Sequence, residues 1–438
     1  MLRARSLFPR YRSWALVSSP VAALVAALAA ALTGCATAPT PSPPQWVVVT
    51  PLTAAAADPA APWFARAASL ALRTELALLP GLMVVAPPPA GRASADTDLA
   101  LPAAWIVGGS VHSDGNGTRF DIALSRRGAS APTWQRRFDY PADGDAARWR
   151  RDIPQALAAQ IGSGPGTAGL GDLGACRSQA AAAGTLRAFE AFGSYRTRDD
   201  LLRMRGWLEE ALRHEPGCAE AQAHLAMTHV SELSNRWSVD PPAQLALADR
   251  LARQALAAEP NQPYAHLARV QLLRMQGQVA AAVDAAATLT RLDPSNGLFV
   301  GRLAALQFDA GNASATLAAA RRMLALPNGT LAVLQQGMLF EALALYALGD
   351  EASAAQGLRK LVALNPQNGM AWRFLAGVEG AQQHDAEAAA ALQRFLALAP
   401  PGQSIRSLRA NETAVADAQF LRQRERFYAG LRRAGLPE

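Results

Sequence analysis

Prolines that end helical segments recur at nearly regular intervals through the second half of the chain. Each follows an apolar run with helical spacing and precedes another, and proline disfavours helical backbone in the residue before it. The intervals between consecutive sites are 44, 34, 33, 39 and 34 residues. The sites are Glu215-Pro216, Glu259-Pro260, Asp293-Pro294, Leu326-Pro327, Asn365-Pro366 and Ala399-Pro400. A period of about 34 residues with a terminal proline predicts a solenoid of helical hairpins.

The segments around these prolines share an apolar helix end, a proline turn and a new helix with a Leu-Ala pair. This pattern resembles the tetratricopeptide repeat (TPR), most closely from Met370 to Pro400. The residues that match its packing positions are Trp372, Leu375 and Ala376 in the first helix and Ala388, Leu392 and Phe395 in the second. The resemblance implies a scaffold that presents a curved surface to a protein or peptide.

We expect about six TPR-like hairpins between residues 180 and 400, the first and last irregular because end repeats must cap a solenoid. The tail, residues 401–438, contains the amphipathic segment Ala414–Ala434. Its apolar face can cover the last hairpin, so we expect a C-terminal capping helix there.

Residues 46–161 have a different pattern, in which short β-branched runs alternate with helical stripes. Expected strands are Trp46–Leu52, Leu82–Ala86, Trp105–Val111, Arg119–Ser125 and Trp134–Tyr140, and expected helices are Pro62–Leu79 and Ala147–Ile161. The turn sequence Asp114-Gly115-Asn116-Gly117 favours a tight hairpin. After Ala86 we expect a loop with a short helix. The order predicts an α+β layer, and hence an α+β N-terminal domain followed by an all-α TPR solenoid.

This region resembles the TolB amino-terminal-like domain. The matching residues are Val49, Pro51, Phe64, Ala65, Leu70, Glu75, Leu76, Leu79, Pro80, Gly81, Leu82, Val84, Gly109, Ser110 and Val111. The resemblance implies a fold and contains no catalytic signature. Proteins that join such a domain to repeats include periplasmic parts of membrane-bound regulators, so it also implies a sensing role as an alternative.

The first 35 residues have the features of a bacterial export signal. Arginines precede an uncharged apolar stretch, which ends at Leu32-Thr33-Gly34-Cys35. These four residues resemble a lipobox, and the resemblance implies lipidation at Cys35. The apolar stretch is also long enough to span a bilayer uncleaved, so an uncleaved anchor is the alternative. Residues 36–45 are expected to form a Pro-rich tether.

Both readings place the bulk of the chain in the bacterial cell envelope, in the periplasm. Ala36 stands where some inner-membrane lipoproteins have Asp, which favours the outer membrane. The formal charge of +7 includes four arginines before the apolar stretch, and the remainder has 38 basic and 35 acidic residues. This small surplus gives no support to nucleic-acid binding.

A Gly-rich stretch, residues 162–179, marks the boundary between the two expected domains. It contains a G-x-G-x-x-G pattern at Gly164 to Gly169, but a helix precedes it and Pro165 removes one amide donor. A nucleotide-binding loop needs a strand before it, so we interpret the stretch as a linker.

Two cysteines, Cys176 and Cys218, remain if Cys35 is lipidated. An even pair in an oxidising compartment permits a disulfide, but spacing alone cannot establish the geometry. We therefore expect two unpaired, partly buried thiols rather than a bridge.

The sequence has no G-x-S-x-G, catalytic cysteine constellation or P-loop, so we expect a non-enzymatic protein without a cofactor. His224 and His229 are five residues apart and do not share a helix face, which argues against a zinc site and leaves no metal ligands predicted. His224 and His266 both lie in an Ala-His-Leu-Ala phrase, which suggests one equivalent repeat position.

The predicted function is therefore a membrane-anchored envelope scaffold whose TPR groove binds a periplasmic or other envelope protein or peptide. Candidate groove residues on the first helices of the hairpins are Gln222, Arg269, Arg302 and Arg373. The alternative is a periplasmic ligand-sensing module that signals to a membrane-bound regulator.

Overall fold

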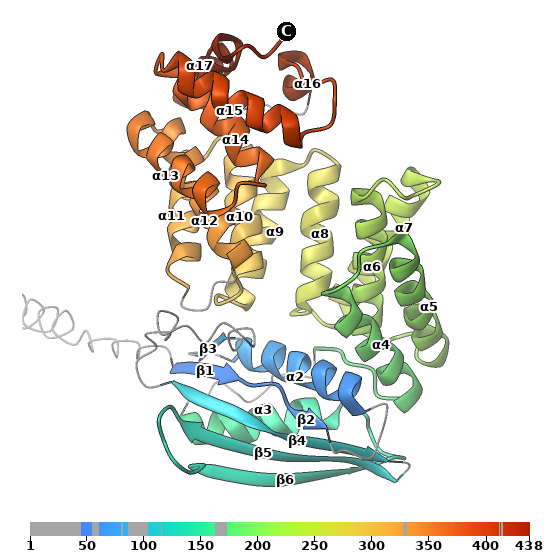
Figure 1. Cartoon of the computed structure of the whole chain (residues 1–438). Helices are drawn as coiled ribbons and strands as arrows, with labels where there is room; N and C mark the ends of the chain where they lie inside the picture. The colour runs from blue at the N-terminus through green and yellow to red at the C-terminus, as the bar shows by residue number, and fades with distance from the viewer. Residues whose placement is uncertain are drawn as a thin grey trace, which may run out of the picture. The chain divides into compact units, whose positions relative to one another are not determined.

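The computed structural model describes residues 45–54, 61–79, 82–85, 104–114, 116–162, 173–326, 331–410, 412 and 415–438 (Figure 1). The predicted signal, the lipidation at Cys35, the tether and the loop after Ala86 lie outside these residues. Among the helices that the structure describes, none is both long and apolar enough to cross a bilayer.

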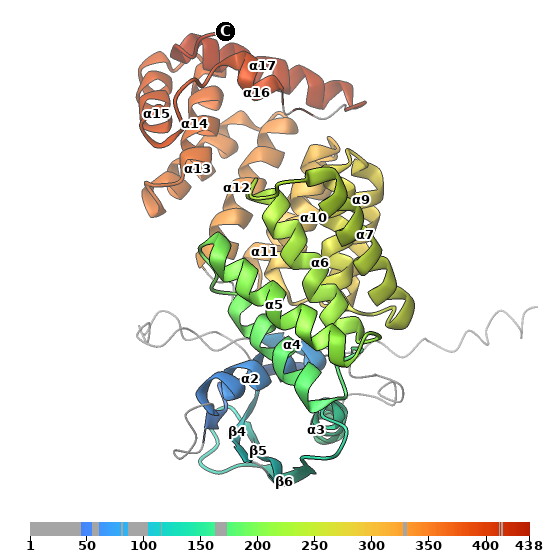
Figure 2. The same cartoon turned by 90° about the vertical axis from the view of Figure 1, so that its right-hand side faces the viewer.

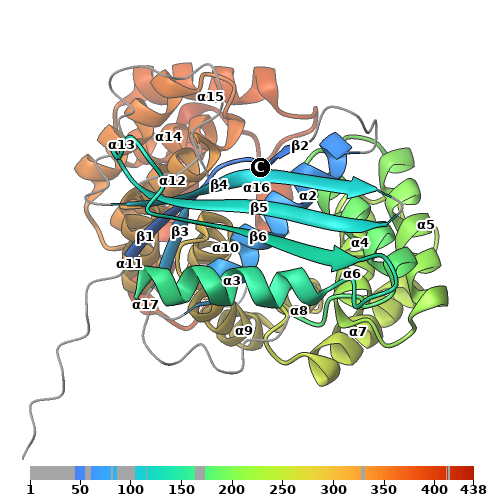
Figure 3. The same cartoon turned by 90° about the horizontal axis from the view of Figure 1, so that it is seen from below.

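The N-terminal domain contains a six-stranded mixed sheet (Figure 3). The strands are β1 (Gln45–Val49), β2 (Thr53–Ala54), β3 (Leu82–Val85), β4 (Trp105–Asp114), β5 (Gly117–Arg126) and β6 (Trp134–Pro141). Their order is β3-β1-β4-β5-β6, with β2 beside β4; β1 runs parallel to β3 and β4, and β4, β5 and β6 are antiparallel.

The predicted strand Trp46–Leu52 ends early, at Val49 of β1, and the short strand β2 follows the predicted range. Pro51 has no backbone N–H and cannot donate to the ladder, so regular pairing stops before it and resumes at Thr53. Further along the sheet, Asp114 pairs with Gly117 to close the predicted hairpin. Gly117 has φ +155°, and a Cβ there would lie 2.3 Å from the Tyr140 carbonyl oxygen, so only glycine fits.

Alternation along β5 separates a core face from a solvent face. Phe120, Ile122 and Leu124 are buried. Between them, Asp121 accepts from Arg137 on β6 at 2.8 Å at an exposed site. The core face is covered by α2 (Ala61–Ala77) and α3 (Arg148–Ile161), whose apolar residues belong to the same buried cluster as the strands. The alternation of buried and exposed residues along the strand therefore determines which face of the sheet the helices cover.

The C-terminal region is all α-helical, and its described residues include six consecutive helical hairpins (Figures 1 and 2). They are α4 (Gln179–Phe192) with α5 (Arg198–His214), α6 (Ala219–Ser234) with α7 (Pro241–Ala258), α8 (Pro263–Met275) with α9 (Val279–Leu292), α10 (Gly297–Asp309) with α11 (Ala313–Leu324), α12 (Leu331–Ala347) with α13 (Glu351–Leu364), and α14 (Gly369–Ala381) with α15 (Asp385–Leu398). The predicted α+β domain and all-α TPR solenoid are confirmed.

The turn at Asn365-Pro366 illustrates how one hairpin is joined to the next. The Asn365 side chain accepts from the backbone N–H of Gln367 at 3.1 Å, and Asn368 caps α14 by accepting from Ala371. The indole Nε1–H of Trp372 donates to the Pro366 carbonyl at 2.9 Å. The proline ends one helix, and the next helix returns a side chain to satisfy the exposed carbonyl.

Two further helices, α16 (Ile405–Arg409) and α17 (Ala418–Ala434), follow the last hairpin. Helix α17 packs against α14 and α15 and also reaches α12 (Figure 2). It contributes Phe427, Tyr428 and Leu431 to the core of the last two hairpins. Its apolar stripe is therefore buried by the solenoid that it covers.

Candidate partner-binding surface and domain joint

The first helices of the hairpins form the inner surface of the solenoid. Helix α4 contacts α6, α6 contacts α8, α10 contacts α12, and α12 contacts α14, whereas α8 and α10 are joined chiefly through α9. Within the described residues, second helices of neighbouring hairpins have few or no such contacts. A stack whose first helices lie closer together than its second helices curves toward them, and such inner surfaces are where repeat proteins bind partners.

The four predicted binding residues occupy four different positions relative to their turn prolines. Gln222 is six residues after Pro216. The corresponding offsets are nine for Arg269, eight for Arg302 and seven for Arg373. Because each residue turns a helix by about 100°, these side chains do not project in one direction. The structure therefore does not bring the four together as one surface.

Gln222 is part of a turn. Its side-chain N–H donates to the Pro216 carbonyl at 2.9 Å, and the residue is buried. His266 Nε2 lies 2.8 Å from the Pro260 carbonyl. Gln222, His266 and Trp372 thus make the same contact, six residues after a turn proline. The assignment of Gln222 to partner binding is therefore not supported.

The same comparison corrects the expected equivalence of His224 and His266. The two share a sequence phrase, but His224 is eight residues after its turn proline and His266 is six residues after its own. His266 closes a turn, whereas His224 is fully buried in the joint between the domains. Burial lowers the pKa of His266, and the contact with the Pro260 carbonyl raises it. The nearby cation Arg269, also on α8, lowers it further.

Arg302 lies on α10 and is partly buried. Burial lowers the pKa of its guanidinium, and the nearby cation Arg274 lowers it further. Its Nε is buried and has no hydrogen-bond partner. In the described part of the chain, no carboxylate forms an ion pair with Arg302, whereas Arg274 has Asp309 at 3.5 Å. A buried cation without a counter-charge is costly for a fold and is ready to receive an anion.

Arg373 lies on α14, in a cavity of about 240 Å³ between the inner surface and α17. Its Nε is also buried without a hydrogen-bond partner, and burial lowers the pKa of the guanidinium. The carbon at the centre of the guanidinium lies 4.9 Å from the centre of the Phe374 ring. Because α17 forms one wall, Arg373 is not on the open part of the inner surface.

A buried ion triad joins the N-terminal domain to the solenoid. Arg150 of α3 lies 2.7 Å from Glu75 of α2 and 2.6 Å from Glu220 of α6, and all three side chains are at most 5% exposed. Burial opposes the charge of Arg150, but the two carboxylates outweigh it and raise the pKa of the guanidinium. The Arg150–Glu75 pair lies within the N-terminal domain, whereas the Arg150–Glu220 pair forms only while the two domains are packed together.

His224 lies beside this triad, with its Nε2 4.0 Å from Glu220. Phe189 of α4 and Tyr264 of α8 flank the ring, with centroid distances of 4.9 and 4.5 Å. Neither ring nitrogen has a hydrogen-bond partner. Burial lowers the pKa of His224 to about 4, although Glu220 acts in the opposite direction. The imidazole is therefore neutral at pH 7.

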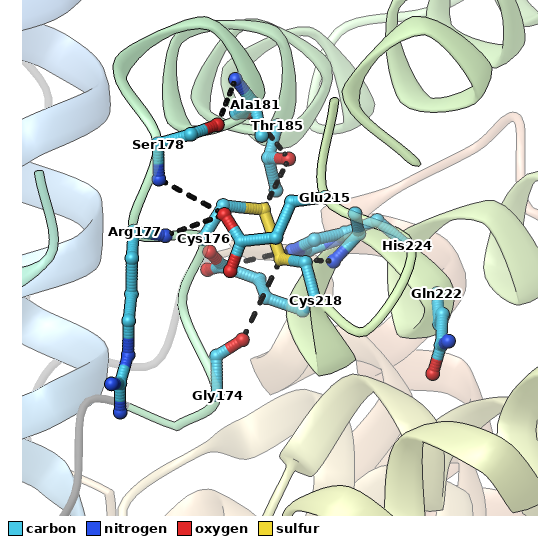
Figure 4. Close-up of a disulfide and its surroundings, with 12 residues drawn as sticks. Gly174, Cys176, Arg177, Ser178, Ala181, Thr185, Glu215, Cys218, Gln222 and His224 are labelled. Atoms are coloured by element: carbon cyan, nitrogen blue, oxygen red, sulfur yellow. Dashed lines mark hydrogen bonds and ion pairs between the residues drawn. A yellow bond between two sulfur atoms is a disulfide. The ribbon is translucent and has the colours of Figure 1, made fainter. Parts of the chain in front are cut away.

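Cys176 and Cys218 form a disulfide with a Cα–Cα distance of 5.1 Å (Figure 4). This corrects the sequence-based preference for unpaired thiols. The pairing follows from the packing of the segment before α4 against the turn before α6, which spacing in the sequence does not reveal. The Glu215 carboxylate accepts from the N–H groups of Arg177 and Ser178 at 2.8 and 2.9 Å beside the bridge.

The end of the predicted linker is consequently fixed to the solenoid. The Gly174 carbonyl accepts from the Glu220 N–H at 3.0 Å, and the Leu173 carbonyl accepts from the Gln262 side chain at 2.8 Å. Residues 173–178 are thus part of the joint, whereas the rest of the Gly-rich stretch after Gly162 lies outside the described residues.

Sequence reasoning missed Arg150, although a signal was present. Arg150, Ile153, Leu157 and Ile161 recur at helical spacing and are all buried, so the arginine falls on the apolar stripe of its helix. A charged residue on such a stripe predicts a buried partner. The described residues contain no group of three or more His, Cys, Asp or Glu side chains arranged to hold a metal ion.

Comparison with known proteins finds no matching family model and no matching curated sequence. The resemblance of residues 46–161 to the TolB amino-terminal-like domain stays a prediction. Among solved structures, PilF of Pseudomonas aeruginosa is 18% identical with a TM-score of 0.42, and the match covers 53% of this chain and 98% of PilF. A tetratricopeptide repeat protein of Parabacteroides merdae is 14% identical with a TM-score of 0.41, covering 59% and 93%.

A third similar structure is YrrB, described as a TPR protein with an unusual peptide-binding site. It is 14% identical with a TM-score of 0.35, and the match covers 46% of this chain and 96% of YrrB. The six hairpins of the chain's own structure define its class, a TPR-type repeat protein with an N-terminal α+β domain.

Proposed function

We propose that this protein is a non-enzymatic scaffold, anchored to the membrane of the bacterial envelope, whose inner surface binds an acidic segment of a partner protein. The observation that carries the proposal is Arg302, a partly buried cation on the inner surface without an ion-pair partner in the described residues. Folding has already removed part of the water around this guanidinium. An ion pair with a partner carboxylate therefore requires less further desolvation of Arg302.

The experiment first identifies the partner with a photo-crosslinking residue placed beside Arg302, followed by mass spectrometry of the crosslinked peptides. Affinity for the identified segment is then measured for the wild type, for Arg302→Met and for the control Arg291→Met. Arg291 is exposed on a second helix and bonds Thr288. We expect Arg302→Met to raise the dissociation constant at least tenfold and the control to leave it unchanged.

The same variant separates binding from folding. Arg302→Met removes a partly buried charge that has no counter-charge among the described residues, so the variant is expected to be at least as stable as the wild type. A variant that is equally stable and binds the segment with unchanged affinity would disprove the role of Arg302.

The membrane anchor is supported by the sequence alone. Cys35→Ala is expected to abolish both lipid attachment and the cleavage of the chain before residue 35. An uncleaved anchor would instead leave membrane attachment and the mass of the chain unaffected.

A second function, ligand sensing coupled to a membrane-bound regulator, is favoured by another cavity. It has a volume of about 160 Å³ and is lined by Trp63 and Trp149 of the N-terminal domain and by Ala182 and Leu186 of α4. The Trp63 Nε1–H is buried without a hydrogen-bond partner. A ligand there would contact both domains, so Trp63→Phe is expected to impair signalling without loss of partner binding if this function holds.

A further inference from the structure

The cavity beneath α17 has walls from two parts of the chain. One wall consists of the C-terminal ends of α10 and α12 and the first half of α14, and the other of α16, α17 and Glu412. Its volume of about 240 Å³ is just below the roughly 300–1,000 Å³ of sites for drug-sized ligands. A small molecule therefore fits the cavity better than an extended peptide.

The apolar lining is mostly aromatic. Its six rings are Phe308, Tyr346, Phe374, Phe420, Phe427 and Tyr428. Phe374 and Phe427 have ring centroids 5.1 Å apart, and Phe308 and Phe420 have centroids 5.2 Å apart. Each of these pairs has one ring on the solenoid and one on α17, so an apolar ligand between the walls would contact both.

Each charged residue that lines the cavity has an ion-pair partner among the described residues, except Arg373. Asp309 lies 3.5 Å from Arg274, and Glu412 lies 3.6 Å from Arg424. Arg373 forms no ion pair or hydrogen bond with any residue that the structure describes, and its Nε is buried. The side-chain oxygen of Gln423 is likewise buried without a partner. The Tyr346 hydroxyl, which also lines the cavity, is buried without a partner as well, so the cavity offers one unmatched cation, one unmatched acceptor and one unmatched hydroxyl group among the described residues.

We infer that this cavity binds a small organic carboxylate with an aromatic body, held by Arg373 and enclosed by the rings of the two walls. The carboxylate supplies the counter-charge that Arg373 lacks, and guanidinium groups match carboxylates with paired N–H donors. The ring fills apolar volume and packs edge-on or offset against its neighbours. A protonated or hydroxyl substituent on the ligand can donate to Gln423.

The site is separate from the proposed partner-binding site at Arg302, because α17 forms one wall of the cavity. A peptide segment would have to displace α17 to reach Arg373, whereas a small acid contacts α17 in place. A bound acid would therefore also stabilise the packing of α17 on the solenoid, since a ligand that binds only the packed state favours it.

The test uses the full chain in detergent and isothermal titration with 3-phenylpropionate. Two comparison compounds are 3-phenylpropanamide, which lacks the charge, and acetate, which lacks the ring. We expect saturable one-to-one binding of 3-phenylpropionate and at least tenfold weaker binding of both comparison compounds. A carboxylate beside an aromatic ring also occurs at the C-terminus of a peptide. An acetylated dipeptide ending in phenylalanine tests this source and is expected to bind at least tenfold more weakly than 3-phenylpropionate.

Three variants assign the site. Arg373→Gln is expected to weaken binding of 3-phenylpropionate at least tenfold, Arg373→Lys to weaken it less because lysine keeps the charge but not the paired N–H donors, and the control Arg269→Gln to leave it unchanged. Circular dichroism establishes that each variant is folded. If Arg373→Gln does not fold, the affinity of Arg373→Lys for 3-phenylpropionate tests the role of Arg373 instead. Absence of saturable binding, or equal binding by the Arg373→Gln variant, would overturn the inference. Equal binding of the dipeptide would overturn its restriction to small acids.

Discussion

Gly380 of α14 and Gly430 of α17 are in backbone contact. A Cβ built on Gly380 would lie 2.2 Å from the carbonyl oxygen of Gly430, and one on Gly430 would lie 2.0 Å from the carbonyl oxygen of Gly377. Side-chain atoms normally keep helix axes 8–10 Å apart, so the absence of a Cβ on both helices permits an unusually close crossing. The position of α17, and therefore the cavity at Arg373, depends on these glycines.

The first prediction is that Gly380→Ala displaces α17. The added methyl group meets backbone that cannot move without shifting the helix, and overpacking of this kind costs about 1–3 kcal/mol of unfolding free energy. The measurement is urea denaturation, together with limited proteolysis of the C-terminal helix. Because the cavity wall moves, binding of 3-phenylpropionate should also weaken.

Gly206→Ala is the matched control for this substitution. Gly206 lies within α5, and a Cβ there would meet no atom within 4 Å. Alanine favours helix by about 0.5–1 kcal/mol over glycine, so this variant should gain stability. Equal effects of the two substitutions would show that helix propensity, and not the crossing, determines the result.

A second prediction concerns the disulfide between Cys176 and Cys218, which closes a loop with a sequence separation of 42 residues. In the chain-entropy model a loop of this length stabilises the fold by about 4 kcal/mol. Reduction should therefore lower the denaturation midpoint of the wild type. A Cys176→Ser, Cys218→Ser double variant should start at the lower midpoint and not respond to reductant. Alkylation of both cysteines before reduction would contradict the bridge.

The turn prolines predicted the hairpins because proline acts locally, through its own φ and the missing N–H. The same local chemistry explains why the hairpin at Gly117 was predictable. The pairing of Cys176 with Cys218 was not, because their distance is set by the packing of α4 and α6, and neither flanking sequence encodes it.

The binding surface was predicted least well. A shared phrase such as Ala-His-Leu-Ala aligns letters, but a shift of two residues on a helix turns a side chain by about 200°, which separates His224 from His266. Arg302 and Arg373 were identified as candidates, yet only the structure shows that neither has a counter-charge among the residues it describes and that α17 covers one of them.

A third prediction addresses the buried triad. Arg150→Met leaves the carboxylates of Glu75 and Glu220 buried without their counter-charge, which should cost about 3–5 kcal/mol of unfolding free energy. Adding Glu75→Leu and Glu220→Leu to that variant should restore much of the loss, because an apolar cluster has no charge to compensate. Urea denaturation of the single and triple variants measures both effects. If the triple variant were less stable than the single variant, the ion triad would contribute more to the unfolding free energy than the apolar cluster that replaces it.

The last prediction is a pH dependence that originates at His224. Its pKa is about 4 in the folded protein and about 6.5 in the unfolded chain, so the unfolded chain takes up a proton first as the pH falls. The groups that face the ring are Glu220, Arg150 and the aromatic rings of Phe189 and Tyr264. The contribution to stability is complete above pH 6.5 and is lost between about pH 6.5 and 4.

By linkage, the loss amounts to about 3 kcal/mol over that interval. His224→Phe keeps an aromatic ring between Phe189 and Tyr264 but has no proton to bind, so its unfolding free energy should fall less steeply with acidification. The quantity to measure is the difference in slope between the wild type and the variant by urea denaturation at several pH values. This difference in slope does not depend on the packing cost of the larger phenylalanine ring, because that cost is the same at every pH. Parallel slopes would mean that His224 titrates alike in the folded and unfolded chains, contrary to its burial without a hydrogen-bond partner.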